Sequence, residues 1–103
     1  MNPARSHSLS GLYVILDPSV CPARPLIEVL TAAAGAGAAL FQYRNKTASM
    51  KDAYVEALAL RQAAAKAGVL FIVNDRCDLA LAVDADGVHL GQGDLPLHLA
   101  RKV

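Results

Sequence analysis

Residues 71–96 read FIVNDRCDLALAVDADGVHLGQGDLP, and this stretch contains two apolar runs that each end in a polar cluster. The first run, Val69–Val73, is β-branched and aromatic and stops at the polar residues 74–76. The second, Val88–Leu90, stops at residues 91–94. Runs of this length and composition are typical of buried strands. Two such strands joined by a short helical segment predict a βαβ unit.

The two carboxylates of interest in this stretch are Asp75 and Asp94, which follow the ends of the two predicted strands. In parallel α/β sheets, catalytic and binding residues lie at the carboxyl ends of the strands. We therefore expect the site of this protein to include these two acids.

The same alternation of strand and helix extends over the whole chain. Strands are expected at Leu12–Leu16, Ala38–Arg44, Val69–Val73 and Gly87–Leu90, and helices at Leu26–Ala34, Ser49–Ala67, Cys77–Val83 and Leu95–Val103. Strict alternation predicts a parallel sheet with helices on the outside. A complete eight-fold barrel requires about 250 residues and seldom fewer than about 200. The 103-residue chain is therefore predicted to be an α/β protein, the N-terminal half of a (βα)8 TIM barrel with four parallel strands alternating with helices.

The predicted domain boundaries follow from this pattern. Residues 1–11 are polar and are expected to form a flexible N-terminal tail, with residues 12–103 as a partial barrel. In the helix expected at Ser49–Ala67, Ser49 and Asp52 resemble a capping box, and Met50, Ala53, Tyr54, Ala57, Leu58 and Ala64 are expected to face the core. The fourth helix reaches Val103 without a C-terminal capping signal, so the chain is predicted to stop within it.

Composition excludes several classes of function. Hydrophobic residues make up 54% of the chain and charged residues 18%, which predicts a packed domain. The net charge of +1 gives no electrostatic reason to expect nucleic acid or an anionic membrane as a partner. Cys21 and Cys77 do not have the spacing of a metal motif. No apolar run approaches the ~20 residues of a membrane helix, and no signal-peptide pattern is present, so a cytoplasmic protein is expected.

Each predicted strand from the second onward is followed by side chains that could bind a metal-bound diphosphate. These are Gln42, Arg44 and Lys46 after the second strand, Asn74 and Asp75 after the third, and His89, Gln92 and Asp94 at the fourth. Mg²⁺ is commonly held by one or two carboxylates while phosphate oxygens and water complete its shell. Arg and Lys neutralise the remaining phosphate charge.

Each of these residues also has a purely structural interpretation. Asp94 and Asp75 could be N-caps of the helices that follow them, and Arg44 and Lys46 could be ordinary loop cations. His89 could be a core histidine with a satisfied hydrogen bond. Gln42 is harder to explain structurally, because a strand interior seldom holds an amide without a partner.

Three motifs together resemble the thiamine phosphate synthase family. They are Gln42-Tyr43-Arg44-Asn45-Lys46, Val73-Asn74-Asp75-Arg76, and the stretch from Gly87 to Pro96 that contains His89, Gln92 and Asp94. The resemblance runs from about Leu12 to the end of the chain. It implies a (βα)8-barrel transferase that couples hydroxymethylpyrimidine diphosphate to a thiazole phosphate and releases pyrophosphate.

The resemblance also implies roles for individual residues. Residues 42–46 and Asn74 would bind the pyrimidine diphosphate, with Arg44 and Lys46 as the catalytic cations, while Asp75 and Asp94 would bind Mg²⁺. Asn45 stands where the family usually has Glu, and Gly93 where an acid is common. The family's downstream phosphate loops, which bind the thiazole phosphate, have no counterpart in the chain.

Two alternatives follow from these departures. The chain could be a non-catalytic half-barrel that binds a pyrimidine phosphate or associates with itself through its open sheet edges. It could also be related to the thiazole tautomerases of the same fold, although Asp94 favours the synthase. We expect the 103-residue chain to be inactive as a monomer.

Overall fold

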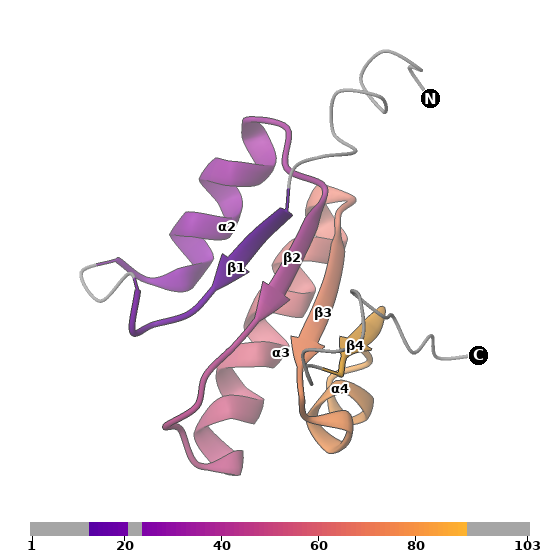
Figure 1. Cartoon of the computed structure of the whole chain (residues 1–103). Coiled ribbons are helices and arrows are strands. Elements are labelled where there is room, and N and C mark those ends of the chain that lie inside the picture. Colours follow the sequence, from indigo (N-terminus) through magenta and orange to yellow (C-terminus); the bar gives the residue numbers. More distant parts are fainter. Residues whose placement is uncertain (1–12, 21–23, 91–103) are drawn as a thin grey trace.

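The computed structural model describes residues 13–20 and 24–90 (Figure 1). The strands are β1 (Tyr13–Leu16), β2 (Leu40–Tyr43), β3 (Leu70–Asn74) and β4 (Gly87–His89), and the helices are α2 (Leu26–Gly35), α3 (Met50–Ala67) and α4 (Cys77–Ala82). The predicted alternation of strands and helices is confirmed. The expected N-terminal tail and the helix expected at Leu95–Val103 lie outside the described residues, as do Gln92 and Asp94.

The four strands form one parallel sheet in the order β1-β2-β3-β4. Because every connection moves one strand further in the same direction, right-handed crossovers place all the connecting helices on the same face. Figure 1 shows the four strands side by side, with α3 crossing behind β2 and β3. This is the arrangement of half a (βα)8 barrel, in which the helices form the outer layer.

The core lies between the sheet and its helices. On the helix-facing side of the strands, the side chains of Leu16, Phe41, Tyr43, Phe71, Val73 and Val88 are at most 5% exposed. The α3 helix packs against them through Ala53, Ala57, Leu60 and Ala64, each at most 1% exposed. Three of these four are alanines, and small side chains let a helix approach a sheet closely.

Two residues expected to face the core from α3 do not do so. Met50 is 36% and Tyr54 38% exposed, whereas Leu60, which was not in the predicted set, is 1% exposed. Met50 lies in the first turn, where its sulfur contacts Arg76 Nη2 at 2.8 Å. Tyr54 follows Ala53, the first residue of the buried stripe, and one residue corresponds to a 100° turn around the helix axis.

The opposite face of the sheet is apolar at the amino-terminal ends of the strands. Tyr13, Leu40 and Leu70 are in register there, and Ile15 follows one layer further along the strands. Tyr13, Ile15 and Leu70 are 40%, 47% and 45% exposed. The helices of the described chain pack on the other face, so this side of the sheet presents large apolar side chains.

The termini of α3 match their sequence signals. Ser49 is the N-cap, and its hydroxyl accepts a hydrogen bond from the Asp52 backbone N–H at 3.1 Å. The helix ends at Ala67 and its C-cap is Gly68, whose φ of 73° is left-handed and favours glycine. Within the described residues, no helix is long and apolar enough to cross a membrane.

Two glycines offer a matched test of this geometry, because an added Cβ would meet nothing within 4 Å at either position. Gly68→Ala should destabilise the fold by about 1–2 kcal/mol, the cost of a left-handed conformation for an L-residue. Gly35 is the last residue of α2 and has no positive φ. Gly35→Ala should stabilise the fold by about 0.4–1 kcal/mol by restricting the unfolded chain. Urea unfolding midpoints of both variants, compared at equal m-values, measure the two changes in stability. Two changes of the same sign would contradict the backbone conformations assigned to Gly68 and Gly35.

Candidate functional site

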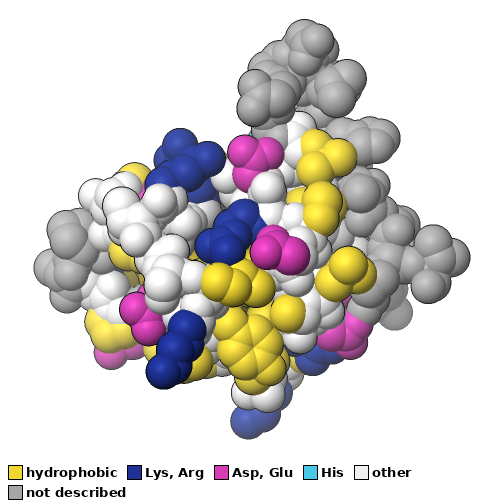
Figure 2. Space-filling model, turned by 90° about the horizontal axis from the view of Figure 1, so that it is seen from below, with side chains coloured by type: hydrophobic (Ala, Val, Ile, Leu, Met, Phe, Trp, Pro, Cys, Tyr) yellow, Lys and Arg dark blue, Asp and Glu magenta, His cyan; other side chains and the backbone are white. Residues whose placement is uncertain are grey.

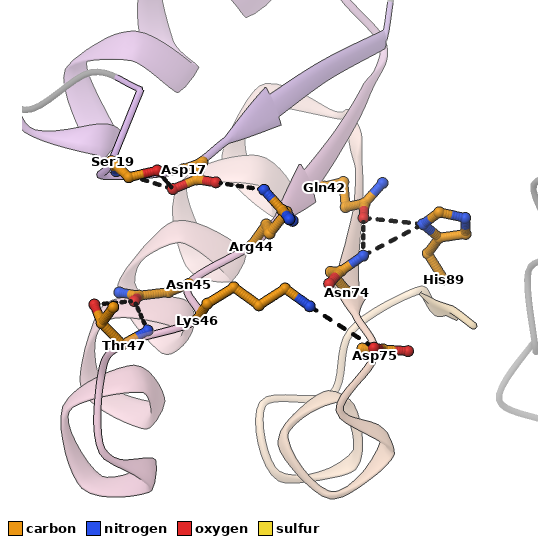
Figure 3. A network of polar contacts seen from close by, with 10 residues as sticks. All are labelled: Asp17, Ser19, Gln42, Arg44, Asn45, Lys46, Thr47, Asn74, Asp75 and His89. Carbon is orange, nitrogen blue, oxygen red and sulfur yellow. Dashed lines mark hydrogen bonds and ion pairs between the residues drawn. The ribbon is translucent and has the colours of Figure 1, made fainter. Parts of the chain in front are cut away.

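The side chain of Gln42 is the centre of a hydrogen-bonded cluster at the carboxyl half of the sheet (Figure 3). It is 1% exposed although it lies on the face away from the helices. Its Nε2 donates to the Tyr13 hydroxyl on β1, and its Oε1 accepts from Asn74 Nδ2 on β3 at 2.7 Å. His89 Nδ1 on β4 lies 3.1 Å from the same oxygen. The expectation that this buried amide must have partners is confirmed.

The ring of His89 contacts two amides through one nitrogen. Its Nδ1 atom lies 3.1 Å from Gln42 Oε1, which accepts, and 3.4 Å from Asn74 Nδ2, which donates. This nitrogen donates to Gln42 in one tautomer and accepts from Asn74 in the other. The structural interpretation of His89 as a histidine with a satisfied hydrogen bond is therefore supported at Nδ1.

Arg44, just after β2, is held by a carboxylate at the end of β1. Arg44 Nη1 lies 3.0 Å from Asp17 Oδ2, and the other oxygen of Asp17 accepts from the Ser19 hydroxyl at 2.7 Å and from its backbone N–H at 2.9 Å. Asp17 is 4% exposed. The hydrogen bond from the Ser19 hydroxyl lowers the pKa of the Asp17 carboxyl, helped by the Ser19 backbone N–H and by Arg44 and opposed by burial.

Asp17 was not among the site residues predicted from the sequence. One signal could have found it. The other three strands of the predicted sheet all deliver a polar side chain at their carboxyl ends, and Asp17 is the residue at that position on β1.

The lowered pKa of Asp17 predicts an acid dependence of stability. The carboxylate contributes stability that is fully present above its unfolded pKa of about 3.9 and is lost as the pH falls through the lower folded value. Asp17→Asn should therefore be less stable than the wild type near neutral pH, and this difference should shrink as the pH falls below about 4. Urea unfolding of both proteins at a series of pH values measures it. A difference that does not change with pH would contradict an ionised Asp17.

Lys46 and Asp75 form a second ion pair at this end of the sheet. Lys46 Nζ lies 3.8 Å from Asp75 Oδ2, and the two side chains are 55% and 39% exposed. A pair this open to water contributes only about 0–1 kcal/mol. The two groups are therefore close together in a weak pair, and Lys46 loses little when a ligand replaces the carboxylate.

The backbone of Asp75 is itself unusual. Its φ of 64° is left-handed, a conformation that Asp tolerates better than most residues, and its N–H donates to the carbonyl of His89 at 2.8 Å. Arg76, not Asp75, occupies the N-cap position of α4. The alternative that Asp75 is the N-cap of this helix is therefore not supported.

Tyr43 and Asn45, expected from the resemblance to bind substrate, lie away from the Gln42 cluster. Tyr43 is 1% exposed on the helix-facing side, where burial and a hydrogen bond to Glu56 of α3 raise the pKa of its hydroxyl. Asn45 Nδ2 donates to the same Glu56 oxygen at 3.1 Å, and its Oδ1 accepts from the backbone N–H groups of Thr47 and Ala48 at 3.1 Å each. These contacts attach the loop that carries Arg44 and Lys46 to α3.

The donor set of this end of the sheet suits Mg²⁺ bound together with a phosphate. Residues 13–20 and 24–90 contain no group of three or more His, Cys, Asp or Glu side chains that could hold a metal alone. Asp75 is the predicted ligand that these residues include, and Asp94 lies outside them. One or two carboxylates are what Mg²⁺ takes from a protein when phosphate oxygens and water supply the other positions.

Figure 2 shows the molecule from the carboxyl ends of the strands, where Lys and Arg side chains lie next to Asp and Glu side chains. Gln42, Arg44, Lys46, Asn74, Asp75 and His89 are brought to this end from three strands and the segments that follow them. The fold and the site therefore define a half-barrel of the (βα)8 class with cations, a carboxylate and amides at the carboxyl ends of its strands.

Comparison with known proteins identifies the family. The sequence model of the thiamine monophosphate synthase family matches residues 12–103, and the chain belongs to this family. It is 51% identical over 92 residues to the thiamine-phosphate synthase of Chloroflexus aurantiacus, covering 89% of this chain and 43% of the relative. The corresponding protein of Persephonella marina is 45% identical over 93 residues, covering 90% of this chain and 44% of the relative.

A solved structure agrees with this assignment. Thiamine phosphate pyrophosphorylase from Pyrococcus furiosus superimposes with a TM-score of 0.71 at 42% identity, covering 82% of this chain and 41% of that one. The chain thus spans less than half the length of the relatives it matches. The resemblance noted from the three sequence motifs is confirmed at the level of the family.

Proposed function

We propose that this chain provides the half of a thiamine phosphate synthase that binds the pyrimidine diphosphate and its metal. The reaction joins hydroxymethylpyrimidine diphosphate to a thiazole phosphate and releases pyrophosphate. The observation that carries the proposal is the convergence of the Gln42–Asn74–His89 cluster with two cations, Arg44 and Lys46, and with Asp75 at one end of the sheet.

The cations are suited to the diphosphate. Arg44 presents a planar guanidinium that can bind phosphate oxygens in pairs, and Lys46 offers a compact charge on a flexible stem. The weak pair of Lys46 with Asp75 favours exchange, because Lys46 loses little when a phosphate replaces the carboxylate. Both groups then stabilise the charge that develops on the departing pyrophosphate.

Asp75, together with Asp94, would hold Mg²⁺ beside these cations. When bound, the metal supplies further charge stabilisation to the phosphate oxygens as a Lewis acid. The left-handed backbone at Asp75 supports a functional role, since such conformations are concentrated at ligand sites. The amides of Gln42 and Asn74 would meet the pyrimidine ring, whose nitrogens require hydrogen-bonding partners.

A chimera tests the transferase function. Residues 12–103 of this chain would replace the matching 92-residue segment of the Chloroflexus aurantiacus relative, and thiamine phosphate formation from the two substrates would be measured. Asp75→Asn, which removes the charge and tolerates a positive φ, should lower the rate roughly a hundredfold or more. Glu28→Gln, at an exposed position in the first turn of α2, is the control and should leave the rate unchanged.

The outcomes discriminate between the two classes of function. An inactive chimera that still binds pyrophosphate would favour a non-catalytic binding half-barrel. Full activity of the Asp75→Asn chimera would show that the metal assignment is wrong. The cytoplasmic location expected from the sequence stays a prediction.

A second candidate function, association, is favoured by the apolar side of the sheet. We propose that the side carrying Tyr13, Ile15 and Leu70, each at least 40% exposed, packs against another half-barrel. Light scattering of the purified chain should then give a mass above that of one copy, and Ile15→Glu should restore the monomer. Val55→Glu, a change at a 63% exposed position on α3, is the control. A wild-type monomer at all concentrations would contradict association with a second copy.

A further inference from the structure

We propose that Asp17 is a positioning residue for the anion site, holding the Arg44 guanidinium in the orientation in which it binds the pyrophosphate group. The proposal rests on the proposed function, since it assumes that Arg44 binds this group. It adds the residue that follows β1 to a site that the sequence motifs placed only on the later strands.

Asp17 is itself held in place on two sides. Its Oδ1 accepts both hydrogen bonds from Ser19, and its carbonyl accepts the Val20 N–H at 3.0 Å, so the turn after β1 closes on the carboxylate. The backbone of Arg44 is tied to the same strand, because its N–H donates to the Leu16 carbonyl at 3.0 Å. Both ends of the Asp17–Arg44 contact are therefore anchored before any ligand binds.

Asp17 and Arg44 differ in how far their side chains are exposed to solvent, and this difference indicates different roles. The Asp17 side chain is 5% exposed, whereas that of Arg44 is 44% exposed. Figure 3 shows the Arg44 guanidinium between Asp17 and Gln42. The carboxylate uses one of the five N–H donors of the guanidinium and leaves the exposed part of the fork directed away from it. The buried side chain of Asp17 does not contact the anion, so Asp17 is not a catalytic residue.

Two physical effects of Asp17 on anion binding have opposite signs. Its negative charge reduces the positive potential around Arg44, so removing the charge would tighten anion binding. Its hydrogen bond orients a side chain with a large rotamer entropy, so removing the bond would weaken anion binding. The proposal requires the second effect to dominate, because the contact is short and the carboxylate is anchored.

Calorimetric titration of the full chain with pyrophosphate in the presence of Mg²⁺ tests this. Arg44→Gln should weaken binding at least about tenfold, and Asp17→Asn about tenfold, the usual effect of losing an outer partner of a ligand-binding group. In the Arg44→Gln background, Asp17→Asn should not weaken binding further, because the guanidinium that Asp17 orients is already lost. Asp84→Asn is the matched control: Asp84 pairs with Arg61 at the same 3.0 Å, and its loss should leave pyrophosphate binding unchanged.

Ser19→Ala provides a second variant that keeps every charge. It removes one hydrogen bond from Asp17 Oδ1 and should weaken pyrophosphate binding less than Asp17→Asn does. A purely electrostatic role predicts no change from Ser19→Ala and tighter binding from Asp17→Asn. Either of these results would overturn the proposal.

Nitrogen-15 relaxation of the Arg44 side chain measures orientation without a ligand. The Nε–H group should be ordered in the wild type and the Asp84→Asn control and mobile in Asp17→Asn. Equal order in all three would overturn the proposal even if Asp17→Asn failed to bind pyrophosphate. Absence of pyrophosphate binding by the wild type, or an unaffected Arg44→Gln, would instead overturn the proposed anion site on which this inference rests.

Discussion

The buried carboxamide of Gln42 connects all four strands of the sheet. It contacts Tyr13 on β1, Asn74 on β3 and His89 on β4, and it is 1% exposed. A buried polar group without partners is costly, so the strands must meet in the register that satisfies it. A slip of one residue would turn Gln42 toward the helices and leave its partners behind. The register that satisfies Gln42 is therefore also the register that brings the side chains of the candidate site together.

Much of the fold could be predicted from the alternation of apolar runs and helical patterns. The strand expected at Ala38–Arg44 is found at Leu40–Tyr43, and the helix expected to start at Ser49 begins at Met50 with Ser49 as its N-cap. The errors concern burial, because the helical period alone does not show which residues of an apolar stripe face the core. Helical spacing includes Met50 and Tyr54 in an apolar stripe, but only the packing of α3 on the sheet shows which part of that stripe is buried.

The part of the candidate site that depends on one residue could be predicted from the sequence, because a buried polar side chain needs hydrogen-bond partners. A contact between two residues far apart in the sequence could not be predicted. A lone Gln in an apolar strand signals that partners exist, and these were found. The contact of Asp17 with Arg44 joins residues 27 positions apart, and its existence depends on the pairing of β1 with β2. Within the motif at residues 42–46, the alternation of a strand separates Gln42 from Tyr43. The motif therefore places Gln42, Arg44 and Lys46 at the carboxyl end of the sheet, and its other members, Tyr43 and Asn45, attach the loop to α3 through Glu56.

The sheet face opposite the helices changes character along the direction of its strands. Tyr13, Leu40 and Leu70 lie in one layer at the amino-terminal ends, and Asn74 and His89 pair at the carboxyl ends, about 13 Å further along. The apolar side chains at the amino-terminal end of this face are thus more stable when shielded from water, whereas the polar side chains at the carboxyl end are well solvated by it. Whatever shields the apolar end from water has no physical reason to close the polar end. The apolar and the polar part of this face are therefore separated along a single axis, the direction of the strands.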